Sequence, residues 1–280
     1  MPFTESLQQP FDLDDCLITA FNAARTGASK LLDACADLAK ARWEGPPEDA
    51  GAPARDSERE IRRVLYEAFP DHPVFVGDGP SRQEAPELFW RAEPLDGAWA
   101  FLKGSPFFSV SLSLVGKGHD GDPSALLGVV LAPALMEMFW AVTGGGAFQW
   151  RQVPGVGRCE GPVSVSDCGR AEEAAARTSL GIAGPEGLAA RRRVLDAVCG
   201  LTAEDSSSLS LAYVATGRAE CHFQAGSDPW ALAAGALLVT GAGGKVTGLT
   251  GERYRPGEGG GILASNGLLH GKFSELLSGG

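Results

Sequence analysis

Glu93-Pro94-Leu95-Asp96-Gly97-Ala98-Trp99-Ala100-Phe101 is the stretch that decides the fold. It continues a strand-like run of apolar residues at 88–92, and its glycine precedes residues that favour a helix. Two carboxylates therefore stand where a predicted strand gives way to a helix. The free backbone N–H groups of the turn at Gly97 and Ala98 form an anion site.

The rest of the chain predicts alternating helices and sheets. The apolar spacing predicts helices at 14–41 and before Pro70, and then strands at 88–92, 107–115, 126–131 and 138–142. Residues 143–148 read as a glycine turn, and Val163 and Val165 as the start of another strand. The C-terminal half predicts helices at 187–198, 206–216, 230–241 and 267–277, and strands near 175–181, 219–224, 245–248 and 261–265. This order predicts a layered α/β fold.

Composition excludes several classes of protein. The 280 residues are 44% hydrophobic, which suits one large domain or two packed halves, and the net charge of −11 disfavours binding to nucleic acid or anionic membranes. The longest apolar stretch, 125–140, is broken by Pro133 and Glu137 and predicts two buried strands rather than a membrane span. The start of the chain shows no signal peptide pattern, and the six cysteines have no CxxC spacing. We therefore expect a soluble cytoplasmic protein with buried thiols.

Three segments in order resemble the motifs of one phosphatase family. Val76-Gly77-Asp78-Gly79 is similar to a Gly-Glu-Glu turn, Glu93 to Phe101 to Asp-Pro-Ile/Leu-Asp-Gly-Thr-x-Asn-Phe, and Trp230 to Ala236 to Trp-Asp-x-Ala-Ala-Gly-Ala. The chain thus resembles the inositol monophosphatase family, whose members use Mg²⁺ to hydrolyse small phosphate monoesters, over about 15–277. The resemblance implies a layered αβαβα sandwich. It also implies a single domain over 1–280, with an α+β half at about 1–150 and an α/β half at about 151–280.

The same resemblance implies a damaged metal site. In the family the ligands are the second Glu of the first motif, both Asp of the second with a carbonyl between them, and the Asp of Trp-Asp; a Thr positions the attacking water. At the matching positions this chain has Gly79, Glu93, Leu95, Asp96, Ala231 and Ala98. Mg²⁺ needs several oxygen ligands in strict geometry. We therefore expect no cofactor, or weak Mg²⁺ binding by Glu93, Asp96 and the Leu95 carbonyl.

Nearby residues leave alternatives open at this site. Asp78 is a candidate substitute ligand, whereas Asp228 lies outside the helix that carries Ala231 and is not expected to help. Asp96 is instead a candidate N-cap of the helix that follows Gly97. Cys221 and His222 are neighbours on one strand and point to opposite faces, so they do not form a nucleophile and base pair.

The resemblance implies a function without assigning any catalytic residue. We expect a pseudoenzyme or repurposed enzyme that no longer hydrolyses phosphate monoesters. Its old pocket would bind, or act without metal on, a small polar or phosphorylated metabolite through Asp96, Gly97, Ala98 and Gln224. Gln224 stands where some members contact the polyol with a Glu; the alternative is a surface residue at a strand end.

Two other functions remain open, together with the oligomeric state. One function is a weak Mg²⁺-dependent phosphatase of sugar or inositol phosphates that uses Asp78, Glu93, Asp96 and the Leu95 carbonyl. The other is a non-catalytic regulatory partner of an active homologue. We also expect a homodimer, because family members commonly associate and the strands at 107–115 and 126–142 are more apolar than one core requires.

Overall fold

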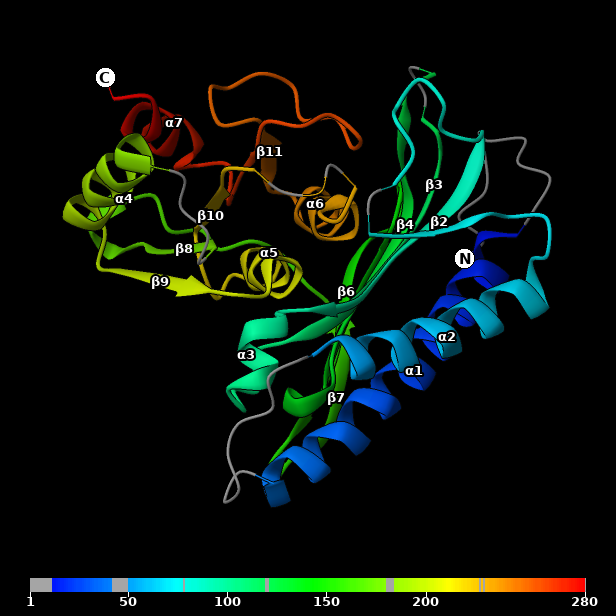
Figure 1. Cartoon of the computed structure of the whole chain (residues 1–280). Coiled ribbons are helices and arrows are strands. Elements are labelled where there is room, and N and C mark those ends of the chain that lie inside the picture. Colours follow the sequence, from blue (N-terminus) through cyan, green and yellow to red (C-terminus); the bar gives the residue numbers. More distant parts are fainter. Residues whose placement is uncertain are drawn as a thin grey trace.

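Helices and sheets alternate in five layers (Figure 1). The computed structural model describes residues 12–41, 50–77, 79–118, 121–179, 184–226, 228 and 230–279. Helices α1 (Leu13–Ala41) and α2 (Gly51–Ala68) form the outer layer, followed by a seven-stranded sheet. Helices α5 (Ser207–Ala215) and α6 (Ala233–Gly241) lie between this sheet and a five-stranded one. Helices α4 (Gly184–Ala197) and α7 (His270–Ser278) form the last layer. The predicted αβαβα class is confirmed.

The first sheet runs in sequence order, and each of its strands pairs antiparallel with the next except β1 with β2, which are parallel. Its strands are β1 (Val74–Val76), β2 (Leu88–Asp96), β3 (Ser109–Lys117), β4 (Pro123–Ala132), β5 (Glu137–Val142), β6 (Gly146–Val153) and β7 (Gly157–Pro162). Strands β3 and β4 are buried along almost their whole length, since α1 and α2 cover one face and α5 and α6 the other. Their continuous apolar sequence therefore belongs to the core of one chain. Those strands do not support a dimer, which stays a prediction.

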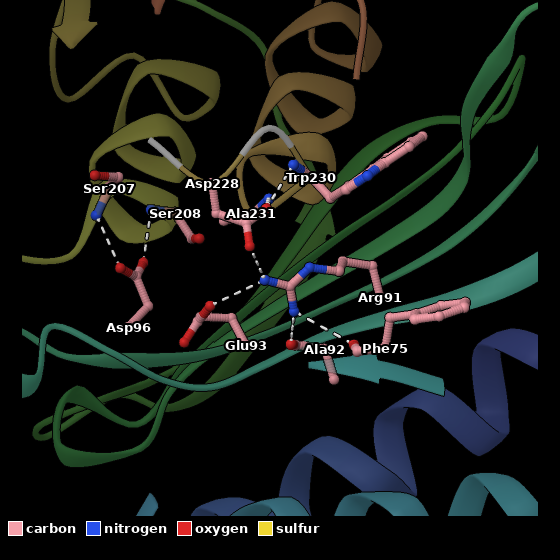
Figure 2. A network of polar contacts seen from close by, with 10 residues as sticks. All are labelled: Phe75, Arg91, Ala92, Glu93, Asp96, Ser207, Ser208, Asp228, Trp230 and Ala231. Atoms are coloured by element: carbon pink, nitrogen blue, oxygen red, sulfur yellow. Dashed lines mark hydrogen bonds and ion pairs between the residues drawn. The ribbon is translucent and has the colours of Figure 1, made fainter. Parts of the chain in front are cut away.

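The second sheet has the order β11-β12-β10-β8-β9. Its strands are β8 (Ala175–Ser179), β9 (Gly200–Glu204), β10 (Cys221–Gln224), β11 (Lys245–Thr247) and β12 (Ile262–Ser265). Strand β8 is parallel to both β9 and β10, whereas β12 is antiparallel to β10 and β11. Helices α5 and α6 pack against both sheets. The N-termini of these two helices lie close to the end of β2 (Figure 2).

Several details of the predicted elements are wrong. Strand β6 begins at Gly146, inside the predicted glycine turn, and no strand begins at Val163, because β7 ends at Pro162. The first sheet thus extends beyond residue 150, while the assignment of 1–280 to a single domain stays a prediction. None of the helices within the described ranges has the length and apolar character needed to cross a membrane.

Candidate functional site

The end of β2 and the starts of α3 (Ala98–Leu102), α5 and α6 surround a cavity of about 410 Å³. The lining residues are Glu93, Leu95, Asp96, Gly97, Ala98, Trp99, Asp205, Ser207, Ser208, Gln224, Ala231 and Leu232. The structure therefore brings together the ligand-binding positions expected from the sequence and the candidate metal positions Glu93, Leu95 and Asp96. Of the two positions where the family ligand is replaced, Ala231 lines the cavity and Gly79 does not. Their role in binding stays a prediction.

Gly97 gives the cavity its shape by turning the chain sharply from β2 into α3. Its φ of 96° lies in the left-handed region that favours glycine, and a Cβ there would lie 3.0 Å from the carbonyl oxygen of Phe107. The pairing of β2 with β3 is also irregular between Glu93 and Asp96. These two features direct the carboxylates of one strand toward the helix starts across the cavity.

Asp96 binds the start of α5 (Figure 2). Its carboxylate accepts hydrogen bonds from the Ser208 N–H at 2.8 Å, the Ser207 N–H at 3.3 Å and the Ser206 hydroxyl at 2.8 Å. Burial raises the pKa of Asp96, and these hydrogen bonds oppose that rise. The interpretation of Asp96 as the N-cap of the following helix is wrong, since Gly97 occupies that position without a side-chain bond.

Asp205 supplies the anion at the start of α3. Its Oδ2 accepts hydrogen bonds from the backbone N–H groups of Trp99 at 2.7 Å and Ala100 at 3.1 Å. Unpaired N–H groups at a helix start attract anions, and a carboxylate satisfies them as a phosphate would. The predicted anion site beside Gly97 and Ala98 therefore already binds a carboxylate of the protein itself.

Glu93 is partly exposed in the cavity, with 28% of its side chain accessible. Burial raises its pKa to about 7; the nearby Asp96 and Asp228 act in the same direction, and the Arg91 guanidinium opposes them. The nearest cation is Arg91, whose Nη2 lies 3.4 Å from the Glu93 Oε2.

Asp228 also faces this cluster, contrary to the expectation from its position in the sequence. Its Oδ2 lies 2.8 Å from the Arg91 Nη2. Its Oδ1 accepts hydrogen bonds from the backbone N–H groups of Trp230 and Ala231. Asp228 therefore lies in the turn before α6, next to the position where the family motif has its last metal-binding carboxylate.

The two lost carboxylate positions differ in their surroundings. Ala231 lines the cavity. Gly79 does not, and a Cβ there would lie 2.6 Å from Cδ1 of the Trp230 indole. Trp230 is only 1% exposed and is fixed by a hydrogen bond from its Nε1 to the Pro80 carbonyl. Asp78, the candidate substitute ligand, lies outside the described residues and stays a prediction.

The described residues do not fit a divalent-cation site. Asp96 accepts several hydrogen bonds at the start of α5, while Glu93 and Asp228 share the Arg91 guanidinium. In the described part of the chain, no three His, Cys, Asp or Glu side chains are grouped so as to hold a metal ion. At least one oxygen of each of these three carboxylates is bound by the protein's own donors, which compete with a hard cation for it.

Gln224 lies at the end of β10 and is buried rather than exposed. Its Oε1 accepts a hydrogen bond from the Ser207 hydroxyl. The alternative of a surface residue is therefore wrong, and the amide is placed at the cavity wall. Cys221 and His222, on the same strand, are both buried; burial raises the pKa of the thiol and lowers that of the imidazole to about 4.

A second cavity, of about 290 Å³, lies in the C-terminal half between α4 and α7. Its walls include Thr178, Arg191, Phe223, Leu249 and Leu277. Its described lining residues include none from the three motifs and no carboxylate cluster. We therefore place the candidate site in the larger cavity at the end of β2.

The five-layer architecture, with carboxylates where β2 meets the helix starts, defines a layered α/β protein of the phosphatase type. The chain belongs to the inositol monophosphatase family, whose sequence profile matches residues 12–279. An inositol-1-monophosphatase of Mesorhizobium japonicum is 32% identical, with 81% of each chain covered. The Nus factor SuhB of Xylella fastidiosa is 33% identical, with 68% of this chain and 65% of that protein covered. The solved structure of the Thermotoga maritima IMPase superposes with a TM-score of 0.77 at 26% identity, covering 95% of this chain and 97% of that one.

Two residues of the site were missed by the sequence reasoning, Arg91 and Asp205, and a third, Asp228, was considered as a ligand and set aside. Arg91 left a signal, because a charged residue in the apolar run Leu88-Phe89-Trp90-Arg91-Ala92 shares a strand face with Glu93, two positions on. Asp205 left no signal of that kind, and the position of Asp228 before the Trp230 motif did not reveal its contact with Arg91. Their partners are more than a hundred residues away in the chain.

Proposed function

We propose that this protein no longer hydrolyses phosphate monoesters by a metal-dependent route and that its cavity has been repurposed for a small polar metabolite. One observation carries the proposal: the protein itself binds the carboxylates around the cavity. Asp96 holds the start of α5, Asp205 holds the start of α3, and Glu93 shares Arg91 with Asp228. Hydrolysis in this family needs such oxygens free for Mg²⁺.

The charge of the cavity supports an uncharged polar ligand over a phosphate ester. Glu93, Asp96 and Asp205 line it, and no lysine or arginine appears among its described lining residues. Like charges brought together in a partly dry site repel strongly. The Ser207 and Ser208 hydroxyls and the Gln224 amide offer hydrogen bonds that suit the hydroxyl groups of a polyol.

A phosphatase assay tests the loss of hydrolysis. We expect no turnover of p-nitrophenyl phosphate or inositol 1-phosphate above background in millimolar Mg²⁺ or Mn²⁺, with an intact family member assayed in parallel. Rates of about 1 s⁻¹ or more, which are typical of working enzymes, would favour the weak phosphatase and sink the proposal.

A binding measurement tests the repurposed cavity. We expect myo-inositol, as a probe polyol, to raise the melting temperature, and inorganic phosphate to have no such effect. Gln224→Ala should abolish the inositol effect, whereas the exposed Gln152→Ala should leave it unchanged. Stabilisation by phosphate but not by inositol would contradict the assigned ligand class.

A second candidate function is that of a non-catalytic partner. The relative from Xylella fastidiosa is named a Nus factor rather than a phosphatase, and that name refers to a function other than hydrolysis. Affinity capture under native conditions would favour this function if a defined partner bound the wild type and the Gln224→Ala variant equally.

A further inference from the structure

Arg91 is a charged side chain placed inside the core. It lies in β2, is 2% exposed, and shares a strand face with Glu93. Burying a guanidinium is costly unless anions and hydrogen bonds compensate it. Its Nη1 donates to the Phe75 and Ala92 carbonyl oxygens, and its Nη2 donates to Glu93 at 3.4 Å and to Asp228 at 2.8 Å (Figure 2).

The position of the guanidinium links two elements that are distant in the sequence. Glu93 belongs to β2, and Asp228 belongs to the turn before α6. The other oxygen of Asp228 binds the N–H groups of Trp230 and Ala231, so the contact also holds the start of that turn. The cation therefore lies between a retained carboxylate position, Glu93, and a lost one, Ala231.

We propose that the Arg91 guanidinium is the resident cation of this site: it neutralises and cross-links the carboxylates that a divalent ion would otherwise join. This inference rests on the proposed loss of metal-dependent hydrolysis. A divalent ion at Glu93 and Asp228 would compete with Arg91 for the Glu93 Oε2 and the Asp228 Oδ2 and would lie beside a fixed positive charge. Arg91 thus excludes the ion as well as replacing it.

Arginine suits this role for physical reasons. Its guanidinium stays charged at every physiological pH and directs its donors in a planar fork toward two acceptors at once. It is weakly hydrated, whereas Mg²⁺ gives up its water reluctantly. The site is therefore complete without any ion from solution.

Removal of Arg91 should make the protein responsive to divalent cations. In Arg91→Leu, Glu93 and Asp228 remain close together without a counter-charge. We expect a lower melting temperature in chelator, and a saturable rise on adding MgCl₂ or MnCl₂ that choline chloride of equal ionic strength does not give. The apparent affinity for the divalent ion should be at least tenfold tighter than in the wild type.

Arg218→Leu is the matched control. Arg218 is half-buried, with 26% of its side chain exposed, and lies 2.8 Å from the buried carboxylate of Glu137; neither residue is among the described residues that line the cavity. The Arg218→Leu variant should be less stable than the wild type but should not respond to divalent cations, because it leaves a single carboxylate, Glu137, without its partner, and not two. An equal response in the wild type or in Arg218→Leu, or no response in Arg91→Leu, would overturn the inference.

A double variant keeps the inference testable if Arg91→Leu fails to fold. Arg91→Leu combined with Asp228→Asn removes one charge of each sign, so it should regain stability relative to Arg91→Leu and lose the divalent response. A double variant that is no more stable than the single one contradicts the resident cation. These stability readouts are independent of turnover by the wild type, so this inference and the proposed function can fail separately.

Discussion

Trp230 restricts what residue 79 can be. Its indole is fixed between the Pro80 carbonyl, which accepts its N–H, and the ring of Phe89, which it meets edge to face at 5.2 Å. Any side chain at residue 79 would meet this indole. A side chain there therefore requires the indole or the turn to shift.

Gly79→Ala should lower the free energy of unfolding by about 1–3 kcal/mol, the usual range for overpacking a core. The new Cβ would lie 2.6 Å from Cδ1 of Trp230, and this ring is only 1% exposed, so the ring or the turn has to shift within a packed region. Urea denaturation followed by Trp fluorescence measures the change. Gly161→Ala is the control, since a Cβ there meets nothing within 4 Å; equal effects at both positions would contradict the packing argument.

Residue identities at the cavity could be predicted from the motifs, but their contacts could not. Glu93, Asp96 and Ala231 were placed by resemblance, and all three line one cavity. The bonds of Asp96 to α5 and of Asp205 to α3 join segments about 110 residues apart, and no local pattern reports such pairs. Long-range side-chain pairing is a property of the tertiary fold and has to be read from it.

The helix starts are the elements on which the cavity depends. Asp96 binds the start of the nine-residue α5 with several hydrogen bonds, and Asp205 binds the start of the shorter α3 with two. Carboxylates at these positions satisfy N–H groups that have no partner within the helix. We therefore expect the two residues to contribute unequally to stability.

Asp96→Asn should reduce the free energy of unfolding by about 1–3 kcal/mol, because an amide nitrogen would face the Ser207 and Ser208 N–H donors. Asp205→Asn should cost about 1 kcal/mol or less, since Asp205 is only half-buried. Chemical denaturation of both variants gives the comparison. A larger loss in Asp205→Asn than in Asp96→Asn would reverse our ranking of the two helix starts.

The elements that sequence patterns found are those with a buried face. Strands β3 and β4 are apolar along their length and were predicted, with ends that moved by a few residues. Strand β7, at the edge of the first sheet, was missed, because its residues are alternately half-buried and exposed and include glycine, proline and charges. Edge strands are held by pairing with a neighbour, which leaves little hydrophobic pattern in the sequence.

At the scale of the whole molecule, two buried histidines among the described residues give stability a dependence on pH. His270 is 4% exposed and bonded to Thr247 and Ser265, and His222 is fully buried. Burial lowers the pKa of each to about 4 from an ordinary 6.5. Both are neutral in the fold, so their stabilisation is full above pH 6.5 and is lost as the pH falls toward 4, where the unfolded chain takes up protons first.

We expect the free energy of unfolding to fall between pH 6.5 and pH 4. His270→Gln should show a shallower fall, since an amide can bond Thr247 and Ser265 without titrating. Glu93 acts in the opposite direction: burial raises its pKa to about 7, so its protonation below that pH increases the free energy of unfolding. The comparison of the His270→Gln variant with the wild type isolates the contribution of His270. Identical pH profiles would show that His270 does not contribute to the pH dependence of stability.

The homodimer is also a prediction about the whole molecule. The prediction now rests only on the expectation that family members associate, because the apolar strands β3 and β4, which first suggested a dimer, are buried within one chain. Sedimentation equilibrium should give twice the chain mass of 29.1 kDa. A species of the single-chain mass at every concentration would show that this member does not associate.

The position of the Trp230 indole beside Gly79 has a consequence for how this cavity can be probed. The family motifs combine a tryptophan at position 230 with a glutamate at position 79, so a side chain returned to residue 79 has room only if the ring or the turn moves. Arg91 is likewise paired with Glu93 and Asp228, and Asp205 is bound to the start of α3. Substitutions at these positions should therefore be non-additive, and combined variants should report on the cavity better than single ones.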